Sequence, residues 1–124
     1  MLIHDEITEK ILRAFFEVYN TLGYGFLEKV YENALFNELT TAGLRVERQH
    51  PIEVGYKRQI VGVYCADLLV ENLVIVELKA ADALREEHEC QLLNYLKATG
   101  IQVGLLLNFG KTPQFKRKIF SGSA

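Results

Sequence analysis

An almost continuous apolar run near the C-terminus, Gln-Val-Gly-Leu-Leu-Leu-Asn over residues 102–108, places the strongest constraint on the fold. A strand with apolar side chains at successive positions buries both of its faces, as parallel strands covered by helices do. The segment 83–99 before it has helical character and ends at Gly100, and residues 73–79 form another apolar run. Strand, helix and strand in this order predict a right-handed crossover. We therefore expect a mixed sheet flanked by helices.

Helical periodicity dominates the first part of the chain, where apolar residues recur every three or four positions. The first predicted helix ends near Leu22, before Gly23, and a second runs from about Leu27 to Ala42, before Gly43. Their apolar stripes consist of Ile7, Ile11, Ala14, Phe15, Val18 and Leu22, and of Leu27, Val30, Tyr31, Ala34, Leu35 and Leu39. The short break between the helices predicts that they pack as neighbours.

Residues 44–80 are rich in Val, Ile and Tyr, with turn residues between short runs, which indicates an antiparallel meander. The strands are predicted at 46–56, interrupted at Pro51, at 60–70 and at 73–79, and a last edge strand at 115–120. The lysines and arginine of that last segment suit an exposed edge. The whole chain, 1–124, is thus predicted to form one α/β (α+β) domain with elements in the order ααβββαββ.

Composition excludes several classes of protein. A length of 124 residues fits about one domain, and 49% hydrophobic with 24% charged residues is ordinary for a folded protein rather than a disordered one. The net charge of −2 differs from that of a strongly basic nucleic-acid coat. No apolar run approaches the roughly 18 residues of a membrane helix, so no membrane partner is expected. The acidic start of the chain lacks a secretory signal, which indicates a cytoplasmic protein.

The two cysteines, Cys65 and Cys90, show neither a CxxC spacing nor a disulfide framework. We expect them to be free, buried thiols. Three scattered histidines do not complete a zinc site with them.

The residues that indicate chemistry lie on two neighbouring predicted strands. Asp67 lies on the strand 60–70, while Glu77 and Lys79 lie on the strand 73–79 and share one face, since residues i and i+2 of a strand point the same way. A two-residue turn at 71–72 would pair Asp67 with Val76 and place the acids on opposite faces. A three-residue connection, 71–73, pairs Asp67 with Glu77. Because a one-residue slip moves every side chain to the other face, a shared site requires the longer connection or a bulge.

Two carboxylates a few ångströms apart disfavour each other's ionisation, and a divalent cation removes that penalty. Mg²⁺ is usually held by one or two carboxylates together with water and substrate phosphate. A neighbouring lysine suits the stabilisation of charge on a phosphate or the orientation of a water. The plainer alternative is that both acids lie at strand ends and the lysine pairs with one of them.

Four sequence features together resemble a known superfamily. Asp67 followed by Glu77-Leu78-Lys79 is similar to the D…(D/E)xK signature of the PD-(D/E)xK nucleases, with Ala66 in place of the usual proline. The segment 25–31, Gly-Phe-Leu-Glu-Lys-Val-Tyr, resembles the GxxExxY motif that names one bacterial family of this superfamily. The resemblance continues through residues 91–96 and 103–109 and so covers nearly the whole chain.

This resemblance implies a restriction-endonuclease-like core and metal-dependent hydrolysis of phosphodiester bonds, with Mg²⁺ or Mn²⁺ as cofactor. It implies that Glu28, Asp67, Glu77 and the carbonyl of Leu78 ligate the metal, and that Lys79 assists the attacking water. The implied partner is nucleic acid, DNA in preference to RNA, and a homodimer is the arrangement expected of a small nuclease that cuts both strands.

Some of these residues also allow structural interpretations. Glu28 in the first turn of a helix favours the positive helix end by about 0.3–1 kcal/mol. Tyr31, on the same helix, is apolar enough to belong to the core, although the motif also suggests a substrate contact. Gln91 and Tyr95 are one turn apart on the helix 83–99, so they face the same way and suit contact with a substrate phosphate, a water or Lys79.

Two other functions are consistent with the sequence. One is a nuclease-like module that binds nucleic acid or a protein partner without cutting it. The other is a different hydrolase with paired carboxylates, such as a glycosidase. Lys79 beside Glu77 and the aliphatic surroundings favour the nuclease.

Overall fold

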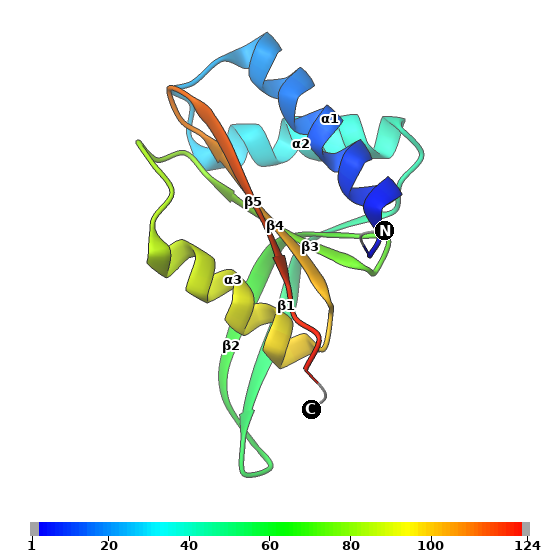
Figure 1. The fold of residues 1–124 in the computed structure, drawn as a ribbon, viewed down its shortest axis with the longest axis vertical. Helices are drawn as coiled ribbons and strands as arrows, with labels where there is room; N and C mark the ends of the chain where they lie inside the picture. Colours follow the sequence, from blue (N-terminus) through cyan, green and yellow to red (C-terminus); the bar gives the residue numbers. More distant parts are fainter. Residues whose placement is uncertain (1–2, 123–124) are drawn as a thin grey trace.

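The predicted helices and strands are present in the predicted order in the computed structural model, which describes residues 3–122 (Figure 1). The elements are α1 (Asp5–Leu22), α2 (Glu28–Thr41), β1 (Val46–Tyr56), β2 (Gln59–Val70), β3 (Val74–Lys79), α3 (Glu86–Thr99), β4 (Val103–Phe109) and β5 (Pro113–Ile119). The predicted start of α3 at residue 83 is three residues early. The helix is preceded by Arg85 in an extended conformation, whose N–H donates to His88 Nδ1 at 3.1 Å.

The strands form one mixed sheet in the order β1-β2-β3-β4-β5. Only β3 and β4 are parallel, and α3 provides the crossover between them. Helices α1 and α2 cover one face of the sheet, and α3 covers the other (Figure 1). The predicted mixed sheet flanked by helices is therefore confirmed, with β5 at one edge as expected.

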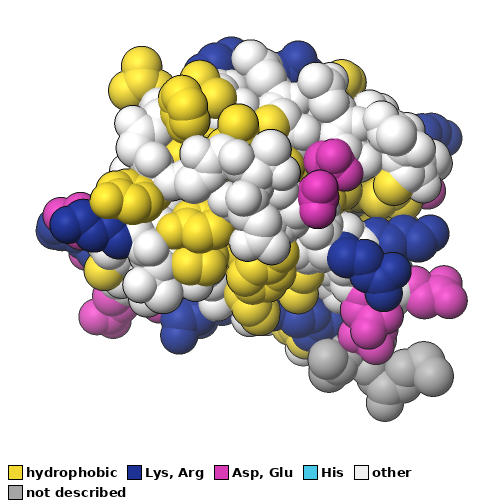
Figure 2. Space-filling view, turned by 90° about the horizontal axis from the view of Figure 1, so that it is seen from above, with side chains coloured by type: hydrophobic (Ala, Val, Ile, Leu, Met, Phe, Trp, Pro, Cys, Tyr) yellow, Lys and Arg dark blue, Asp and Glu magenta, His cyan; other side chains and the backbone are white. Residues whose placement is uncertain are grey.

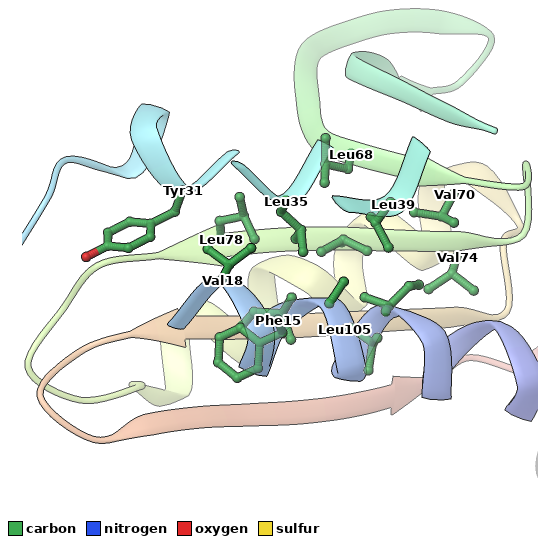
Figure 3. Packing of buried hydrophobic residues seen from close by; sticks show 14 of the residues in the cluster. Phe15, Val18, Tyr31, Leu35, Leu39, Leu68, Val70, Val74, Leu78 and Leu105 are labelled. Carbon is green, nitrogen blue, oxygen red and sulfur yellow. The ribbon is translucent and has the colours of Figure 1, made fainter. Parts of the chain in front are cut away.

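The larger core lies between the sheet and the α1–α2 pair. Figure 3 shows Phe15 and Val18 of α1 and Tyr31, Leu35 and Leu39 of α2 against the side chains of three central strands. Alternate residues of β3, including Val74 and Leu78, belong to this core, whereas Ile75 points to the smaller core beneath α3. The strand is thus buried on both faces, as its apolar sequence predicts.

The β1–β2 hairpin extends away from the rest of the molecule, at the bottom of Figure 1. Its two-residue turn is formed by Lys57 and Arg58, both with positive φ (48° and 68°), as a tight hairpin turn requires. Several apolar side chains near the turn are exposed, among them Tyr56 and Val61, each at 61%.

Two predictions about burial are wrong. Leu27 and Val30 do not belong to the buried stripe of α2: Leu27 precedes the helix in an extended conformation, and the buried stripe is Tyr31, Leu35 and Leu39. Together with Tyr24 and Phe26 they are exposed on the α1–α2 connection and the first turn of α2. Hydrophobic side chains also reach the surface at several places in the view from above (Figure 2).

The cysteines are the second correction. Cys65 and Cys90 are free, as expected, but both are exposed rather than buried. Cys65 lies on the protruding hairpin and Cys90 on α3, and neither residue belongs to a core cluster. No helix between residues 3 and 122 is long and apolar enough to cross a membrane.

Candidate functional site

The connection between β2 and β3 places the two predicted acids opposite each other. The strands pair Leu68 with Val76 and Val70 with Val74, so the loop is the three-residue one, and the next position along brings Asp67 level with Glu77. Its turn is made possible by positive φ values at residues 71 and 72. The register that a shared site requires is therefore the one observed.

The acids lie where regular pairing between β2 and β3 stops. Beyond Leu68 and Val76 the ladder is continued by side chains: the Asp67 N–H donates to Glu77 Oε2 at 2.7 Å, and the Leu78 N–H donates to Asp67 Oδ2 at 2.8 Å. Each carboxylate thus binds the backbone of the opposite strand. Side-chain oxygens therefore take the place of backbone partners where the ladder between β2 and β3 ends.

Burial makes this pair of acids electrostatically unusual. Glu77 is only 7% exposed. This burial, followed by the charge of Asp67, raises the pKa of Glu77 to about 8. Burial is also the main cause of the raised pKa of Asp67, opposed chiefly by the hydrogen bond from Leu78. A negative charge on both groups at once is therefore costly.

Lys79 follows on the same face of β3, half-buried beside the acids. Its positive charge lowers the pKa of both Asp67 and Glu77, which places it within electrostatic reach of the pair. Among the described residues, its ammonium forms no ion pair within 4 Å of either carboxylate. The positive charge of Lys79 thus acts on both acids without forming an ion pair with either of them.

The segment after Lys79 is fixed by Asn108, which the sequence did not indicate. Asn108 is fully buried on β4, opposite Lys79, and binds Ala81 twice: its Oδ1 accepts from the Ala81 N–H and its Nδ2 donates to the Ala81 carbonyl, both at 2.9 Å. A side chain on Gly110 would approach the same carbonyl to 2.4 Å, so glycine is required there. Asn108 therefore determines where the chain leaves the site.

Helix α2 contributes two acids, of which only Glu28 is predicted. Glu28 is exposed in the first turn, and its charge is the smallest of the effects that raise the pKa of Glu77. One turn later, Glu32 is 4% exposed and accepts from Gln49 at 2.7 Å. Gln49 also donates to Asp67 Oδ1 at 3.5 Å, so it links Glu32 to the acid pair.

The buried charge of Glu32 is balanced by two cations. Lys29 lies 3.0 Å from its Oε2, and Arg48 lies 3.4 Å from the same atom. The sequence signal that would have identified Glu32 is its position four residues after Glu28, on the same face of the helix and next to buried Tyr31.

These acids fit a divalent cation in their chemistry, although they do not form a complete shell. Asp67 and Glu77 offer buried carboxylate oxygens whose mutual repulsion a cation would relieve. No three histidine, cysteine or carboxylate side chains of residues 3–122 gather closely enough to enclose an ion. The structure thus brings two of the predicted ligands together and leaves Glu28 apart from them.

On the other side of the site, α3 presents Gln91 and Tyr95 together, as predicted from their spacing. The Gln91 Nε2 donates to the Tyr95 hydroxyl at 2.7 Å, and Tyr95 is 6% exposed. Burial raises the pKa of Tyr95, and the charge of Glu77 is the next cause. Tyr95 packs with Ala66 and Ile75, which are close in sequence to the two acids, so it lies on the side of the sheet that bears Glu77.

Tyr31 has a structural role in this arrangement. Its side chain is fully buried and stacks on Phe109, with ring centroids 4.2 Å apart. Its hydroxyl donates to the Gly23 carbonyl at 2.7 Å and accepts from the Phe26 N–H at 3.2 Å. The ring thereby holds the α1–α2 connection in place and presents no exposed surface to a substrate.

Comparison with known proteins agrees with this architecture. The family model described as "PD-(D/E)XK nuclease superfamily" matches residues 5–119. No curated protein matches the chain. Among solved structures, the fold is similar to "Crystal structure of SSO0001", with a TM-score of 0.58 and 16% identity over 77% of this chain and 52% of that chain. The chain therefore spans about half the length of that protein, and the likeness concerns the fold.

Proposed function

Because the chain belongs to the PD-(D/E)XK nuclease superfamily, we propose that it is a divalent-metal-dependent nuclease that hydrolyses phosphodiester bonds, of DNA in preference to RNA. We assign it within the superfamily to the GxxExxY family, on the segment Gly25–Tyr31. The observation that carries the proposal is the placement of Asp67 and Glu77 opposite each other where the β2–β3 ladder ends, with Lys79 two positions after Glu77 on the same face of β3.

The residues have distinct roles in this proposal. Asp67 and Glu77 would hold a Mg²⁺ or Mn²⁺ ion, with the Leu78 carbonyl as a further oxygen ligand. Glu28, which lies apart from the pair in the first turn of α2, would join them only by approaching the bound ion. When bound, such an ion supplies a water of lowered pKa and polarises a phosphoryl oxygen. Lys79 stabilises negative charge on the phosphate or orients the attacking water. Gln91 and Tyr95 position the substrate from α3, on the side of the sheet that bears Glu77.

A second candidate is a module that binds nucleic acid without cutting it. It is favoured by one observation: the oxygens of Asp67 and Glu77 already accept hydrogen bonds from backbone amides, and no third ligand joins them in the described residues. The two functions differ in whether the bound nucleic acid is cleaved, so a cleavage assay distinguishes them.

The test is a panel of single- and double-stranded DNA and RNA, incubated with Mg²⁺, with Mn²⁺ or with chelator. The proposal expects cleavage that requires metal and is lost in Asp67→Asn. Asp82→Asn is the matched control, since Asp82 is an exposed aspartate shortly after β3. Cleavage that survives unchanged in Asp67→Asn, or that chelator does not affect, would contradict the assignment.

A further inference from the structure

A groove lies between α3 and the protruding β1–β2 hairpin. Its volume is about 570 Å³, and one wall is formed by Val54, Gly55 and Tyr64 of the hairpin. The other wall comes from α3 and consists of Glu87, Cys90, Gln91, Asn94, Tyr95, Lys97 and Ala98. Figure 1 shows the two elements that supply these walls, α3 and the upper part of the β1–β2 hairpin.

The surface of this groove is aromatic and amide in character. Tyr64 and Tyr95 lie with ring centroids 5.8 Å apart, tilted by 41°, and Tyr64 remains 49% exposed while Tyr95 is nearly buried. Tyr95 therefore supports the inner side of Tyr64 and leaves an aromatic surface open to the groove. Flat rings of this kind stack on nucleobases without preference for sequence.

Charge distinguishes a base from a phosphate as the occupant. The groove is lined by one acidic and one basic residue, Glu87 and Lys97, so its lining has no net formal charge. The nearby pair, Asp67 and Glu77, adds carboxylates rather than cations. A phosphate would find little to neutralise it here, whereas the amides of Gln91 and Asn94 offer donors and acceptors to the edge of a base.

The groove is continuous with the candidate site through Tyr95. This residue lines the groove and packs in the smaller core with Ile75, which lies two positions before Glu77 on the same face of β3. A nucleotide whose base lies on Tyr64 would therefore have its sugar and phosphate close to the acid pair. A base can reach this surface only after it has left the stacked, paired interior of a duplex.

We propose that the groove between α3 and the β1–β2 hairpin binds an unpaired nucleobase by stacking on Tyr64, so that the substrate is single-stranded nucleic acid. The inference deepens the nuclease proposal and rests on it for the position of the cleaved bond. Binding of the base does not itself require metal or catalysis, so it is tested separately.

The first experiment measures binding in chelator, where no cleavage occurs. The probe is a short single strand containing 2-aminopurine, whose fluorescence falls when the base stacks. Tyr64→Ala is expected to weaken binding roughly 5- to 150-fold, the range of base–aromatic stacking, while Tyr64→Phe keeps the ring and the affinity. Tyr56→Ala is the matched control, since Tyr56 is an exposed tyrosine of the same hairpin that does not line the groove.

The two cysteines provide a second reading in the unmodified protein. Both are exposed, but Cys90 lines the groove and Cys65 does not. A bound single strand should slow alkylation of Cys90 by iodoacetamide and leave Cys65 unaffected, whereas a strand of abasic sites should protect neither. Parallel arms with single-stranded DNA and single-stranded RNA identify the sugar.

The outcomes separate this inference from the nuclease proposal. Duplex binding as tight as single-strand binding, equal affinity of Tyr64→Ala and wild type, or equal protection of both cysteines would overturn it. Binding of single strands that depends on Tyr64, without cleavage of any substrate, would support the groove and refute the nuclease. Metal-dependent cleavage that ignores Tyr64 would support the nuclease and refute the groove.

Discussion

Asp67 and Glu77 are hydrogen-bonded crosswise between β2 and β3, since the Asp67 N–H donates to the Glu77 carboxylate and the Asp67 carboxylate accepts from the residue after Glu77. The acids therefore replace the backbone ladder at the point where it stops. In the metal-free protein these carboxylates have a structural role, and any cation that binds them competes with the amides.

The first prediction concerns pH. The pKa of Glu77 is raised from its ordinary value of 4.5 to about 8 in the folded protein, so between these values the folded state holds a proton that the unfolded state releases. The free energy of unfolding of metal-free protein should thus fall as pH rises from about 4.5 to 8, by on the order of 4 kcal/mol. Denaturant titrations at several pH values in chelator would measure the slope.

Glu77→Gln should flatten this dependence, because an amide has no proton to lose, and it should be the more stable protein at pH 8. Glu53→Gln, which changes an exposed glutamate of β1, serves as control and should follow wild type. A wild-type stability that rises over this pH range would contradict the assigned cause.

The second prediction concerns metal binding. A cation that binds only the folded state stabilises it by about 2.7 kcal/mol at a hundredfold excess over Kd. Millimolar Mn²⁺ should therefore raise the Tm of wild type, and much less that of Asp67→Asn, in thermal melts at pH 8. Asp82→Asn should behave as wild type, and equal shifts in Asp67→Asn and wild type would count against the acid pair as the metal site.

The third prediction separates metal binding from catalysis at Lys79. Its ammonium is not a metal ligand, so Lys79→Ala should keep the Mn²⁺-dependent rise in Tm. The cleavage rate should fall by roughly 10²–10³-fold, the usual effect of removing one group that stabilises transition-state charge. Lys10→Ala, which removes an exposed lysine of α1, is the control for loss of a positive charge. A rate that is unchanged in Lys79→Ala, with parallel purification to exclude contaminants, would remove Lys79 from the mechanism.

The fourth prediction concerns Asn108. Asn108→Ala leaves both the N–H and the carbonyl of Ala81 without their side-chain partners, and should lower the free energy of unfolding by roughly 1–3 kcal/mol. Because the same bonds fix the chain after Lys79, cleavage should fall while the Mn²⁺ shift in Tm persists. Asn108→Asp keeps the acceptor but puts a buried carboxylate oxygen against the Ala81 carbonyl, so it should be at least as destabilising as Asn108→Ala. Wild-type stability of both variants would contradict the role of Asn108.

Much of the fold follows from the periodicity of the hydrophobic residues along the sequence. The change from helical spacing to alternating and continuous apolar runs gives all the elements in order, and the apolar β4 gives a strand buried on both faces. The register of Asp67 and Glu77 stayed open between two turns, because the sequence of residues 71–73 permits either. The structure resolves it through the pairing of Val70 with Val74 and of Leu68 with Val76, a register that composition does not reveal.

The missed residues share one cause, which is that their partners are distant in sequence. Asn108 binds a residue 27 positions earlier, and Glu32 accepts from Gln49, 17 positions later. Neither belongs to a repeating pattern. Leu27 was misplaced for a local reason, since α2 begins one residue after it and its side chain leaves the helical stripe.

The alternation of β3 has a consequence for how such a protein can diversify. Glu77 and Lys79 face the site, while Leu78 between them is packed in the larger core. Adjacent residues of one strand therefore serve the reaction and the interior of the protein. A change there disturbs both at once. The hairpin residues that line the groove have no such second role. Evolution can therefore change which substrate is bound there while the reaction stays the same.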